Sequence, residues 1–305
     1  MRWLVALVLA AGCGRLGFDP HAGDARGDAP AGDAVVCTWS TPIALPGPIQ
    51  STDDDWAPTP TRGGLQLYFF SFRTGGVGGA DLWYATRQSV TAEFGAAADV
   101  TQLDTTDDER SPTLTDDGLD ILFARDTATT GDIYEAQREE TDDPFGTAVL
   151  APNLSSSAAD ADPFVSADGL RVVFASSRIG PDQHGLDLFE STRPSRTDSF
   201  AVPTELAALD TDEDDFAPTL SADALDIWFS STRPGGPGGA DIYTAHRDAT
   251  DLPFGAPTLV PALSSPLDDV DPRLSLDGTT MYLNYATVTS GGANADLDVS
   301  TRSCD

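Results

Sequence analysis

The sequence predicts an all-β protein whose main domain is a five-bladed β-propeller of four-stranded antiparallel blades. The first reason is an internal repeat, in which an acidic cluster, a proline, a turn, an aromatic strand and a Gly-rich loop recur five times. The repeat prolines are spaced by 54, 51, 55 and 54 residues and are Pro58, Pro112, Pro163, Pro218 and Pro272. A period of about 50 residues is typical of propellers and arrays, in which each repeat buries its faces only against its neighbours.

The second and third reasons are strand periodicity and hairpin turns within each repeat. Leu65, Leu67 and Phe69 alternate with polar positions, as the residues of a half-buried strand do. Asp-Gly pairs, the strongest local hairpin signal, separate two such runs at Asp117-Gly118, Asp168-Gly169 and Asp277-Gly278. The third strands are expected to open at Asp81, Asp132, Asp187, Asp241 and Asp296, and the fourth strands at Phe94, Phe145, Phe200 and Phe254. Four strands per repeat make a propeller blade.

The N-terminus reads as an export signal. Arg2 precedes a short apolar run that ends before Cys13 and cannot span a membrane. The small residues before Cys13 resemble a bacterial lipobox, which implies that this cysteine is lipidated and that the protein is exported and anchored in the cell envelope. Gly14 after the cysteine favours the outer membrane, on its periplasmic side or surface. The expected division is a signal peptide over 1–12, the lipidated Cys13 and a flexible Gly/Ala/Asp/Pro linker over 13–36, and a propeller over 37–305 with repeats starting near 53, 107, 158, 213 and 267.

The ends of the propeller segment predict how the ring closes. The last repeat stops at Cys304, where its fourth strand is due, and the segment from Cys37 to Pro42 resembles the start of a fourth strand. The N-terminal strand is therefore expected to join the last blade. This places Cys37 beside Cys304, and in an exported protein the two are expected to form a disulfide. With Cys13 lipidated, no cysteine is left over.

The charge of the chain restricts its partners. The sequence has a formal net charge of -32 and contains no lysine. Nucleic acids and anionic membrane surfaces require basic patches, so neither is expected as a partner, and the lipid is the only expected contact with the membrane. Cations, basic proteins or other cell-envelope components are the better candidates. The protein is expected to be a monomer.

The repeat itself resembles the TolB-type, WD40-like propeller repeat, with its aromatic strand, Ser-x-Arg and Asp-Ile-Tyr elements. Phe174 to Arg178 and Phe229 to Arg233 are the best copies, whereas Thr127 and Thr287 stand in place of the arginine in the second and fifth repeats. The resemblance covers residues 53–305 and implies a propeller. TolB has six blades and a separate N-terminal domain. A six-bladed ring is less favoured here because only five repeats are present.

One acidic residue lies three positions before each repeat proline. These residues are Asp55, Glu109, Asp160, Asp215 and Asp269. By symmetry they form a ring on one face, and carboxylate oxygens are ligands that Ca²⁺ prefers. A competing and preferred interpretation is structural, with the acids at strand ends or paired with the arginines of the neighbouring loops. Those arginines, Arg73, Arg178 and Arg233, are also candidates for a binding face.

These features favour a lipid-anchored, non-catalytic propeller that binds a protein or an envelope component through its acidic face. One alternative is a glycan-acting hydrolase or a glycan-binding five-bladed propeller, because such hydrolases need two carboxyl groups across a cleft. An acid that occurs in one blade only would favour the hydrolase, and Glu190 and Glu205 are the candidates. The other alternative is a scaffold that Ca²⁺ stabilises. The expectation is that the chain is not an enzyme.

Overall fold

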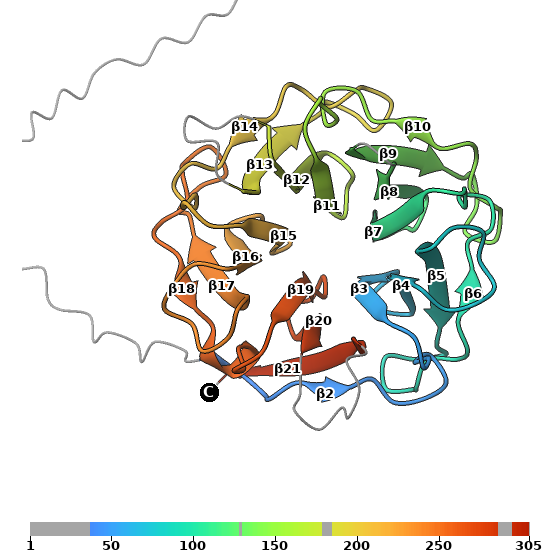
Figure 1. The fold of residues 1–305 in the computed structure, drawn as a ribbon, viewed down its shortest axis with the longest axis horizontal. Coiled ribbons are helices and arrows are strands. Elements are labelled where there is room, and N and C mark those ends of the chain that lie inside the picture. The colour runs from blue at the N-terminus through green and yellow to red at the C-terminus, as the bar shows by residue number, and fades with distance from the viewer. Residues whose placement is uncertain (1–36, 128–129, 179–184, 286–294, 305) are drawn as a thin grey trace, which may run out of the picture. The chain divides into compact units, whose positions relative to one another are not determined.

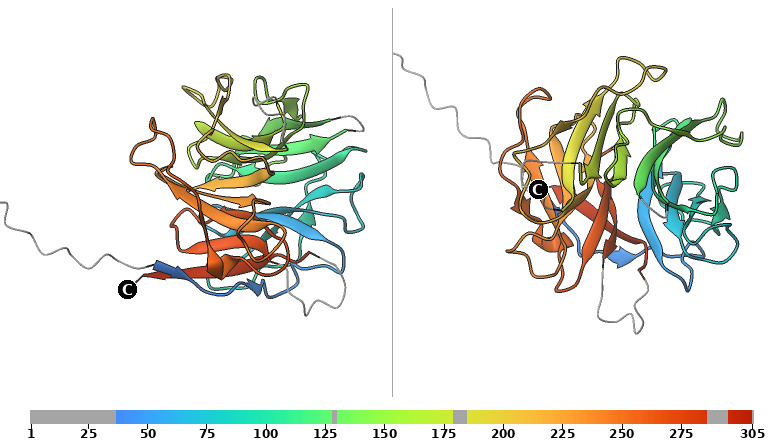
Figure 2. Two further views of the ribbon diagram at one scale, coloured as in Figure 1. Left: turned by 60° about the vertical axis from the view of Figure 1, so that its left-hand side comes forward. Right: turned by 45° about the horizontal axis from the view of Figure 1, so that its top comes forward.

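The computed structural model describes residues 37–127, 130–178, 185–285 and 295–304. Over these residues the chain forms five antiparallel sheets, which stand around a central axis as the blades of a propeller (Figure 1). Each sheet is twisted, as Figure 2 shows from two further directions. The predicted all-β, five-bladed fold is confirmed. Within the described residues no helix is long and apolar enough to cross a membrane. The predicted signal, Cys13 and the linker lie outside the described residues.

Each sequence repeat contributes most of one blade. Blade 1 consists of β3 (Asp55–Thr61), β4 (Gln66–Ser71), β5 (Asp81–Thr86) and β6 (Ala98–Asp99), and blade 2 of β7 (Asp108–Leu114), β8 (Asp120–Asp126), β9 (Gly131–Gln137) and β10 (Val149–Leu150). Blade 3 consists of β11 (Asp160–Val165), β12 (Arg171–Ser176), β13 (Asp187–Thr192) and β14 (Thr204–Glu205), and blade 4 of β15 (Asp215–Leu220), β16 (Asp226–Ser231), β17 (Asp241–His246) and β18 (Thr258–Leu259). The connection after β18 contains a short 3₁₀ helix, η1 (Pro261–Leu263).

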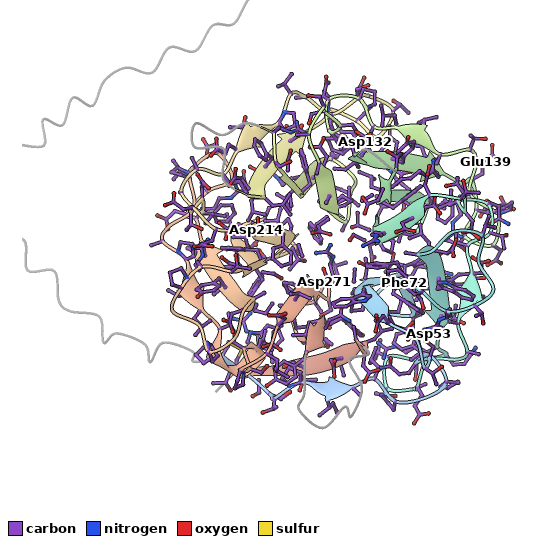
Figure 3. All side chains as sticks on the ribbon, viewed as in Figure 1. Asp53, Phe72, Asp132, Glu139, Asp214 and Asp271 are labelled. Atoms are coloured by element: carbon purple, nitrogen blue, oxygen red, sulfur yellow. A yellow bond between two sulfur atoms is a disulfide. The ribbon has the colours of Figure 1, made fainter. Side chains whose placement is uncertain are left out.

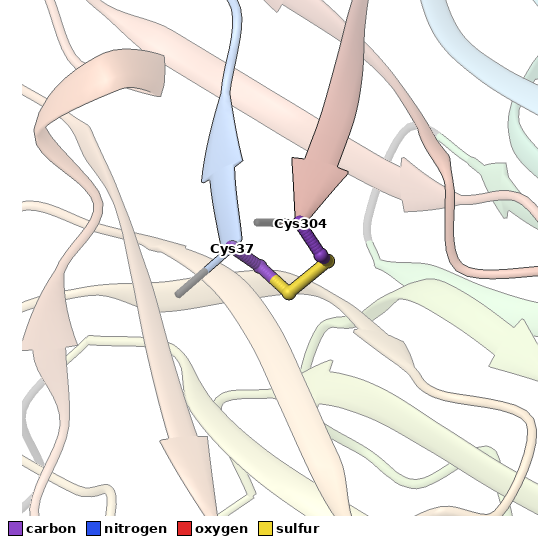
Figure 4. The surroundings of a disulfide bond; sticks show 2 residues. All are labelled: Cys37 and Cys304. Atoms are coloured by element: carbon purple, nitrogen blue, oxygen red, sulfur yellow. A yellow bond between two sulfur atoms is a disulfide. The ribbon is translucent and has the colours of Figure 1, made fainter. Parts of the chain in front are cut away.

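The fifth blade is closed by the N-terminal segment, as predicted. It contains β19 (Asp269–Leu274), β20 (Thr280–Tyr285), β21 (Asp298–Cys304), β1 (Cys37–Trp39) and β2 (Ile43–Ala44). β1 and β2 both pair with β21, with Cys37 opposite Cys304. The two cysteines form the predicted disulfide (Figure 4). The third strand of this blade begins at Asp298, two residues later than expected.

The cores of the propeller lie between its blades. Five clusters of buried apolar side chains each join two neighbouring sheets. In one of them Tyr68 of blade 1 packs with Phe123 of blade 2, and in another Phe69 of blade 1 packs with Tyr282 of blade 5. A blade alone therefore leaves its apolar faces exposed, which is the physical reason for the ring.

The spacing of Asp, Arg and Phe that recurs in the repeats has a structural explanation. The arginine near the end of each third strand lies over an aromatic ring, with the guanidinium carbon 4.3 to 5.7 Å from the ring centroid. In four blades this ring belongs to the connection that follows, and in blade 5 it belongs to β1. The pairs are Arg87–Phe94, Arg138–Phe145, Arg193–Phe200, Arg247–Phe254 and Arg302–Trp39. The prediction that these phenylalanines open the fourth strands is wrong, because the short outer strands begin four residues later.

Each innermost strand carries a bulge at the residue before the repeat proline. The register shifts there, and the backbone enters the left-handed region at Ala57 (φ 53°), Ser111 (47°), Asp162 (49°), Ala217 (49°) and Asp271 (57°). Residues other than glycine seldom adopt this conformation, and bulges often redirect a side chain next to a functional site. The bulges decide which side chains face the axis.

Candidate functional site

The five acids of the predicted ring lie at the beginning of the innermost strands, and all are fully buried. Four of them form ion pairs with an arginine of the same blade, over 2.5 to 2.8 Å. The pairs are Asp55–Arg73, Glu109–Arg125, Asp160–Arg178 and Asp215–Arg233. Asp269 accepts a hydrogen bond from the backbone N–H of Ser265. These carboxylates therefore occupy one position in each of five blades.

The three arginines considered for a binding face are held within their blades. The side chains of Arg73, Arg178 and Arg233 are 11, 19 and 11% exposed. Each guanidinium lies over two aromatic rings of its own sheet as well as against its carboxylate. In the second repeat the corresponding arginine is Arg125, which lies within strand β8. The repeat pattern places Thr127 at this position and therefore does not identify Arg125. In the structure these arginines therefore make contacts that stabilise the blade to which each belongs.

A cavity of about 470 Å³ opens where the innermost strands converge on one face of the ring. We call it the axial cavity. Its apolar wall is made by aromatic rings from two blades, Trp56 and Phe70 of blade 1 and Phe216 of blade 4. Its polar lining consists of Arg110, Ser111, Asp126, Asp162, Asp214, Thr232, Asp268 and Asp271. Figure 3 labels Asp214 and Asp271, which lie beside the central opening. Side chains from all five blades contribute to the axial cavity.

Two acids of this cavity, Asp162 and Asp271, are the bulge residues of blades 3 and 5. Asp271 is only 7% exposed. Burial, with a further contribution from the charge of Asp162, raises the pKa of Asp271 to about 7. Asp162 accepts a hydrogen bond of 2.6 Å from the hydroxyl of Ser111, the bulge residue of blade 2. The two carboxyl groups thus influence each other electrostatically in one cavity.

A third acid and an arginine line the side of the cavity toward blade 2. Arg110 donates to Asp108 over 2.6 Å and lies 3.2 Å from the carboxylate of Asp126. Burial raises the pKa of Asp126, and the neighbouring carboxylates of Asp108 and Asp162 raise it further. The guanidinium of Arg110 also lies over the ring of Phe70, 5.8 Å from its centroid. The cavity therefore combines carboxyl groups with flat apolar and cationic surfaces.

One buried side chain on the axis, that of Arg273, links the innermost strands of three blades. Arg273 follows the proline of blade 5 and is 1% exposed. It donates to the carbonyl oxygens of Pro218 and Pro163 over 2.8 and 3.4 Å. A separate hollow at the opposite mouth is lined by the hairpin turns, among them Asp168 and Asp223. Arg273 contacts the innermost strands of three blades and lies, along its own strand, between Asp271 of the axial cavity and Leu274 of the opposite hollow.

The residues that sequence reasoning offered as single-copy acids lie elsewhere. Glu190 of β13 pairs with Arg171 and Arg247 over 2.6 and 2.8 Å, and Glu205 belongs to the outer strand β14. Neither lines the axial cavity. Asp162 and Asp271 were visible as acids before a proline. The signal that distinguishes them is that three of the five repeats have Ala or Ser at this position.

Known proteins resemble this chain in fold and not in sequence. No family model matches the sequence, and no curated protein matches it. Solved structures match the fold. Glycoside hydrolases share it.

Two hydrolase structures illustrate the match. A GH43_1 enzyme from Xanthomonas citri, solved with xylotriose, has a TM-score of 0.59 and 16% identity, over 85% of this chain and 89% of that one. The catalytic domain of the GH62 α-L-arabinofuranosidase from Coprinopsis cinerea has a TM-score of 0.56 and 12% identity, over 87% of this chain and 97% of that one. At such identities the likeness shows the fold alone.

TolB proteins also match. TolB from Acinetobacter baumannii has a TM-score of 0.51 and 16% identity over 83% of this chain, but this chain spans only 55% of the length of that TolB. The expected relation to TolB is thus supported at the level of the fold. The expectation that the chain is not an enzyme is overturned by the hydrolase matches. It relied on the absence of axial acids that differ between blades, and Asp162 and Asp271 stand at a position that is acidic in only two of the five blades.

Proposed function

We propose that this protein is a glycan-acting hydrolase whose axial cavity binds a neutral glycan. The observation that carries the proposal is the pair of carboxyl groups of Asp162 and Asp271, at a position that is acidic in only two of the five blades, in an aromatic-walled cavity. Glycoside hydrolysis needs two carboxyl groups, one of which has a raised pKa. Flat apolar rings such as Trp56 and Phe216 suit the faces of sugar rings. The many acids of the lining disfavour anionic sugars by charge repulsion.

The geometry assigns a role to each carboxyl group. Asp271, with a pKa of about 7, is protonated in a substantial fraction of the molecules at neutral pH and can donate the proton to the oxygen of the glycosidic bond as that bond breaks. Asp162 is the second carboxyl group and acts on the anomeric carbon or on the water that attacks it. The hydroxyl of Ser111 orients Asp162 through their hydrogen bond of 2.6 Å. Water supplies the hydroxyl group that the cleaved sugar gains.

A direct test measures release of reducing ends from a panel of neutral oligosaccharides that begins with xylotriose and cellotriose, the sugars in two matched structures. We expect Asp271→Asn and Asp162→Asn each to lower the rate by about 100-fold or more. Asp168→Asn, which alters an acid at the opposite mouth, serves as the control and is expected to retain activity. Absence of hydrolysis across the panel, or full activity in Asp271→Asn, would refute the proposal.

A second candidate is a protein partner bound at the acidic face. The likeness to TolB supports it, as does the exposed aromatic Phe72, which lies beside Arg110 near the axis and is 39% exposed. A photo-crosslinking amino acid at position 72 in intact cells is expected to capture one defined protein. The same group at Val202, which is 78% exposed, serves as the control. Equal capture from both positions would exclude a specific site.

Export and lipid anchoring complete the proposal. We infer from the residues before Cys13 that this cysteine carries lipid and holds the protein in the bacterial envelope, with the outer membrane favoured. Metabolic labelling with a fatty-acid analogue is expected to mark the protein and to fail in Cys13→Ser. Labelling of that variant would contradict the anchor.

A further inference from the structure

Two of the five blade junctions carry a group of four acids at identical spacing. In the first junction Asp81 opens β5, and the other three acids follow 18, 23 and 28 residues later. In the junction between blades 3 and 4 the same spacing from Asp187 again reaches three acids. The two groups are Asp81, Asp99, Asp104 and Glu109, and Asp187, Glu205, Asp210 and Asp215. We call them the junction clusters.

The other three junctions show that the blade does not need an acid at the position of Asp104. At the position of Asp104, the junctions after blades 2 and 4 have Ser155 and Ser264, and the junction after blade 5 has Gln50. Each neutral side chain accepts a hydrogen bond from the backbone N–H next to the aspartate position of the third strand. The bonds are Ile133 N to Ser155 Oγ (3.0 Å), Ile242 N to Ser264 Oγ (3.2 Å) and Leu297 N to Gln50 Oε1 (3.2 Å). Serine or glutamine therefore supplies the hydrogen-bond acceptor at the position where the junction clusters have aspartate.

The first junction cluster has the dimensions of a cation site. Asp81, Asp104 and Glu109 each offer one oxygen, and these three oxygens all lie within 4.8 Å of one another. Ca²⁺ binds oxygens at about 2.3 to 2.6 Å, so two oxygens on one ion lie up to about 5 Å apart. Both carboxylate oxygens of Asp104 and one of Asp99 are shielded from water and have no hydrogen-bond partner.

The second junction cluster contains a deeply buried carboxylate with an unused oxygen. Asp187 is 6% exposed, and its Oδ1 has no hydrogen-bond partner. The carboxyl group of Asp187 contacts that of Asp210, and the carboxylates of Glu205 and Asp215 lie close enough for their charges to act on it. A buried acceptor without a donor is destabilising. A bound cation removes this cost.

The basic residues of the chain do not supply that counter-charge. The chain has no lysine. Among the described residues no arginine or histidine forms an ion pair with Asp81, Asp104 or Asp187. Arg125 and Arg233 neutralise only the margin of each cluster, at Glu109 and Asp215. The unpartnered oxygens of Asp104 and Asp187 therefore remain available to a cation, whereas Oδ1 of Asp81 also accepts hydrogen bonds from the backbone N–H groups of Val77 and Gly78.

We propose that each junction cluster binds one Ca²⁺ ion, which fastens blade 1 to blade 2 and blade 3 to blade 4. All the ligands on offer are oxygens, which suit a hard cation and not a metal that prefers sulfur or imidazole. Two of the five acids of the predicted ring, Glu109 and Asp215, belong to these clusters. The other three, Asp55, Asp160 and Asp269, lie at junctions that have glutamine or serine at the position of Asp104. The proposal is independent of the activity of the axial cavity.

The test is a calcium titration of the full, disulfide-bonded chain by calorimetry. We expect about two ions per chain, with dissociation constants of about 10⁻⁴ to 10⁻³ M or tighter. Asp104→Ser and Asp210→Ser, which copy the serine of the other junctions, are each expected to remove one ion, and the double variant to remove both. Asp248→Ser is the matched control, because that side chain is 93% exposed.

A second readout distinguishes the two sites. Trp83 pairs with Asp99 across β5 and β6, whereas the corresponding residue of the second cluster is Phe189. Tryptophan-sensitised terbium luminescence is therefore expected in the wild type and in Asp210→Ser, and is expected to be lost in Asp104→Ser. In EDTA the two serine variants are expected to unfold at a higher temperature than the wild type. Unchanged stoichiometry in both variants, or no saturable binding by the wild type, would overturn the proposal.

Discussion

Arg273 donates a hydrogen bond of 2.8 Å to the carbonyl oxygen of Pro218, across the boundary between blades 5 and 4. The guanidinium is fully buried on the axis, and Asp271 lies two residues before it in the same strand. Burial lowers the pKa of Arg273, and the charges of Asp271 and Asp162 oppose that change. The buried cation of Arg273 therefore partly offsets the charge of the two acids, Asp271 and Asp162, that line the axial cavity.

Replacing this cation tests that balance. Arg273→Met keeps most of the volume but removes the donors to Pro218 and Pro163. Buried acceptors without donors cost about 1 to 3 kcal/mol each, so the free energy of unfolding is expected to fall by that order in chemical denaturation. The pKa of Asp271 is expected to rise above its value of about 7, because Arg273 holds it down. A variant as stable as the wild type would show that Arg273 fills space only.

The acid–arginine pairs within the blades predict a large difference between two ion pairs. Arg233→Met leaves Asp215 fully buried without its partner, and loss of one member of a buried pair costs about 3 to 5 kcal/mol. His246 and Asp226 form an exposed pair, 58 and 40% exposed, so Asp226→Asn is expected to cost at most about 1 kcal/mol. Urea unfolding of both variants measures the difference. Equal costs would contradict a structural role for Arg233.

The disulfide predicts a loss of stability when the ring is opened. Cys37 and Cys304 join β1 to β21 across a separation of 267 residues. Replacing both cysteines by serine is expected to lower the free energy of unfolding by about 2 to 5 kcal/mol, chiefly through the gain in freedom of the unfolded chain. Reduction of the wild type is expected to have the same effect. If the serine variant unfolds at the same urea concentration as the oxidised wild type, hydrogen bonding of β1 and β2 to β21 suffices to close the ring.

Features that depend on residues close together in the sequence are predictable, whereas features that depend on residues far apart in the sequence are not. The blades are encoded locally, by alternating strands and by turn glycines such as Gly118 and Gly169, whose positive φ angles, 72° and 75°, suit the Asp-Gly turns. The closing strand is predictable because Cys37 and Cys304 mark both ends of one gap. The axial cavity is not predictable in this way, because Asp162 and Asp271 meet only after the whole ring has closed.

Arg125 and Asp162 also reach their positions through structure that the sequence pattern does not reveal. Arg125 replaces the arginine that the repeat lacks at position 127, and only the strand geometry shows that its guanidinium reaches Glu109. The left-handed bulge that brings Asp162 to the axis is a backbone feature that residues other than glycine seldom adopt, although aspartate adopts it more readily than most. Repeat alignment identifies such positions only when their differences between repeats are examined along with their similarities.

The buried acids predict that the folded state is most stable at mildly acidic pH. Burial raises the folded-state pKa of Asp271 and of Asp298 to about 7, above the value of about 3.9 expected in the unfolded chain. Between these two values the folded protein binds more protons than the unfolded one, so the free energy of unfolding falls as pH rises. It is expected to level off above about pH 7, once both groups are ionised in each state. Thermal unfolding in EDTA at a series of pH values from 4 to 9 measures this slope.

Asparagine cannot ionise, so Asp271→Asn is expected to flatten part of that slope and to raise the unfolding temperature at pH 8 relative to the wild type. Asp168→Asn is the control, because hydrogen bonds from Ser166 and the backbone N–H of Leu170 lower the pKa of that acid. Its contribution is present at neutral pH and is lost on acidification, so the substitution is expected to reduce stability at pH 7. A wild type whose stability rises steadily from pH 4 to 8, with no change of slope in Asp271→Asn, would show that Asp271 is ionised in the folded protein and cannot serve as the proton donor.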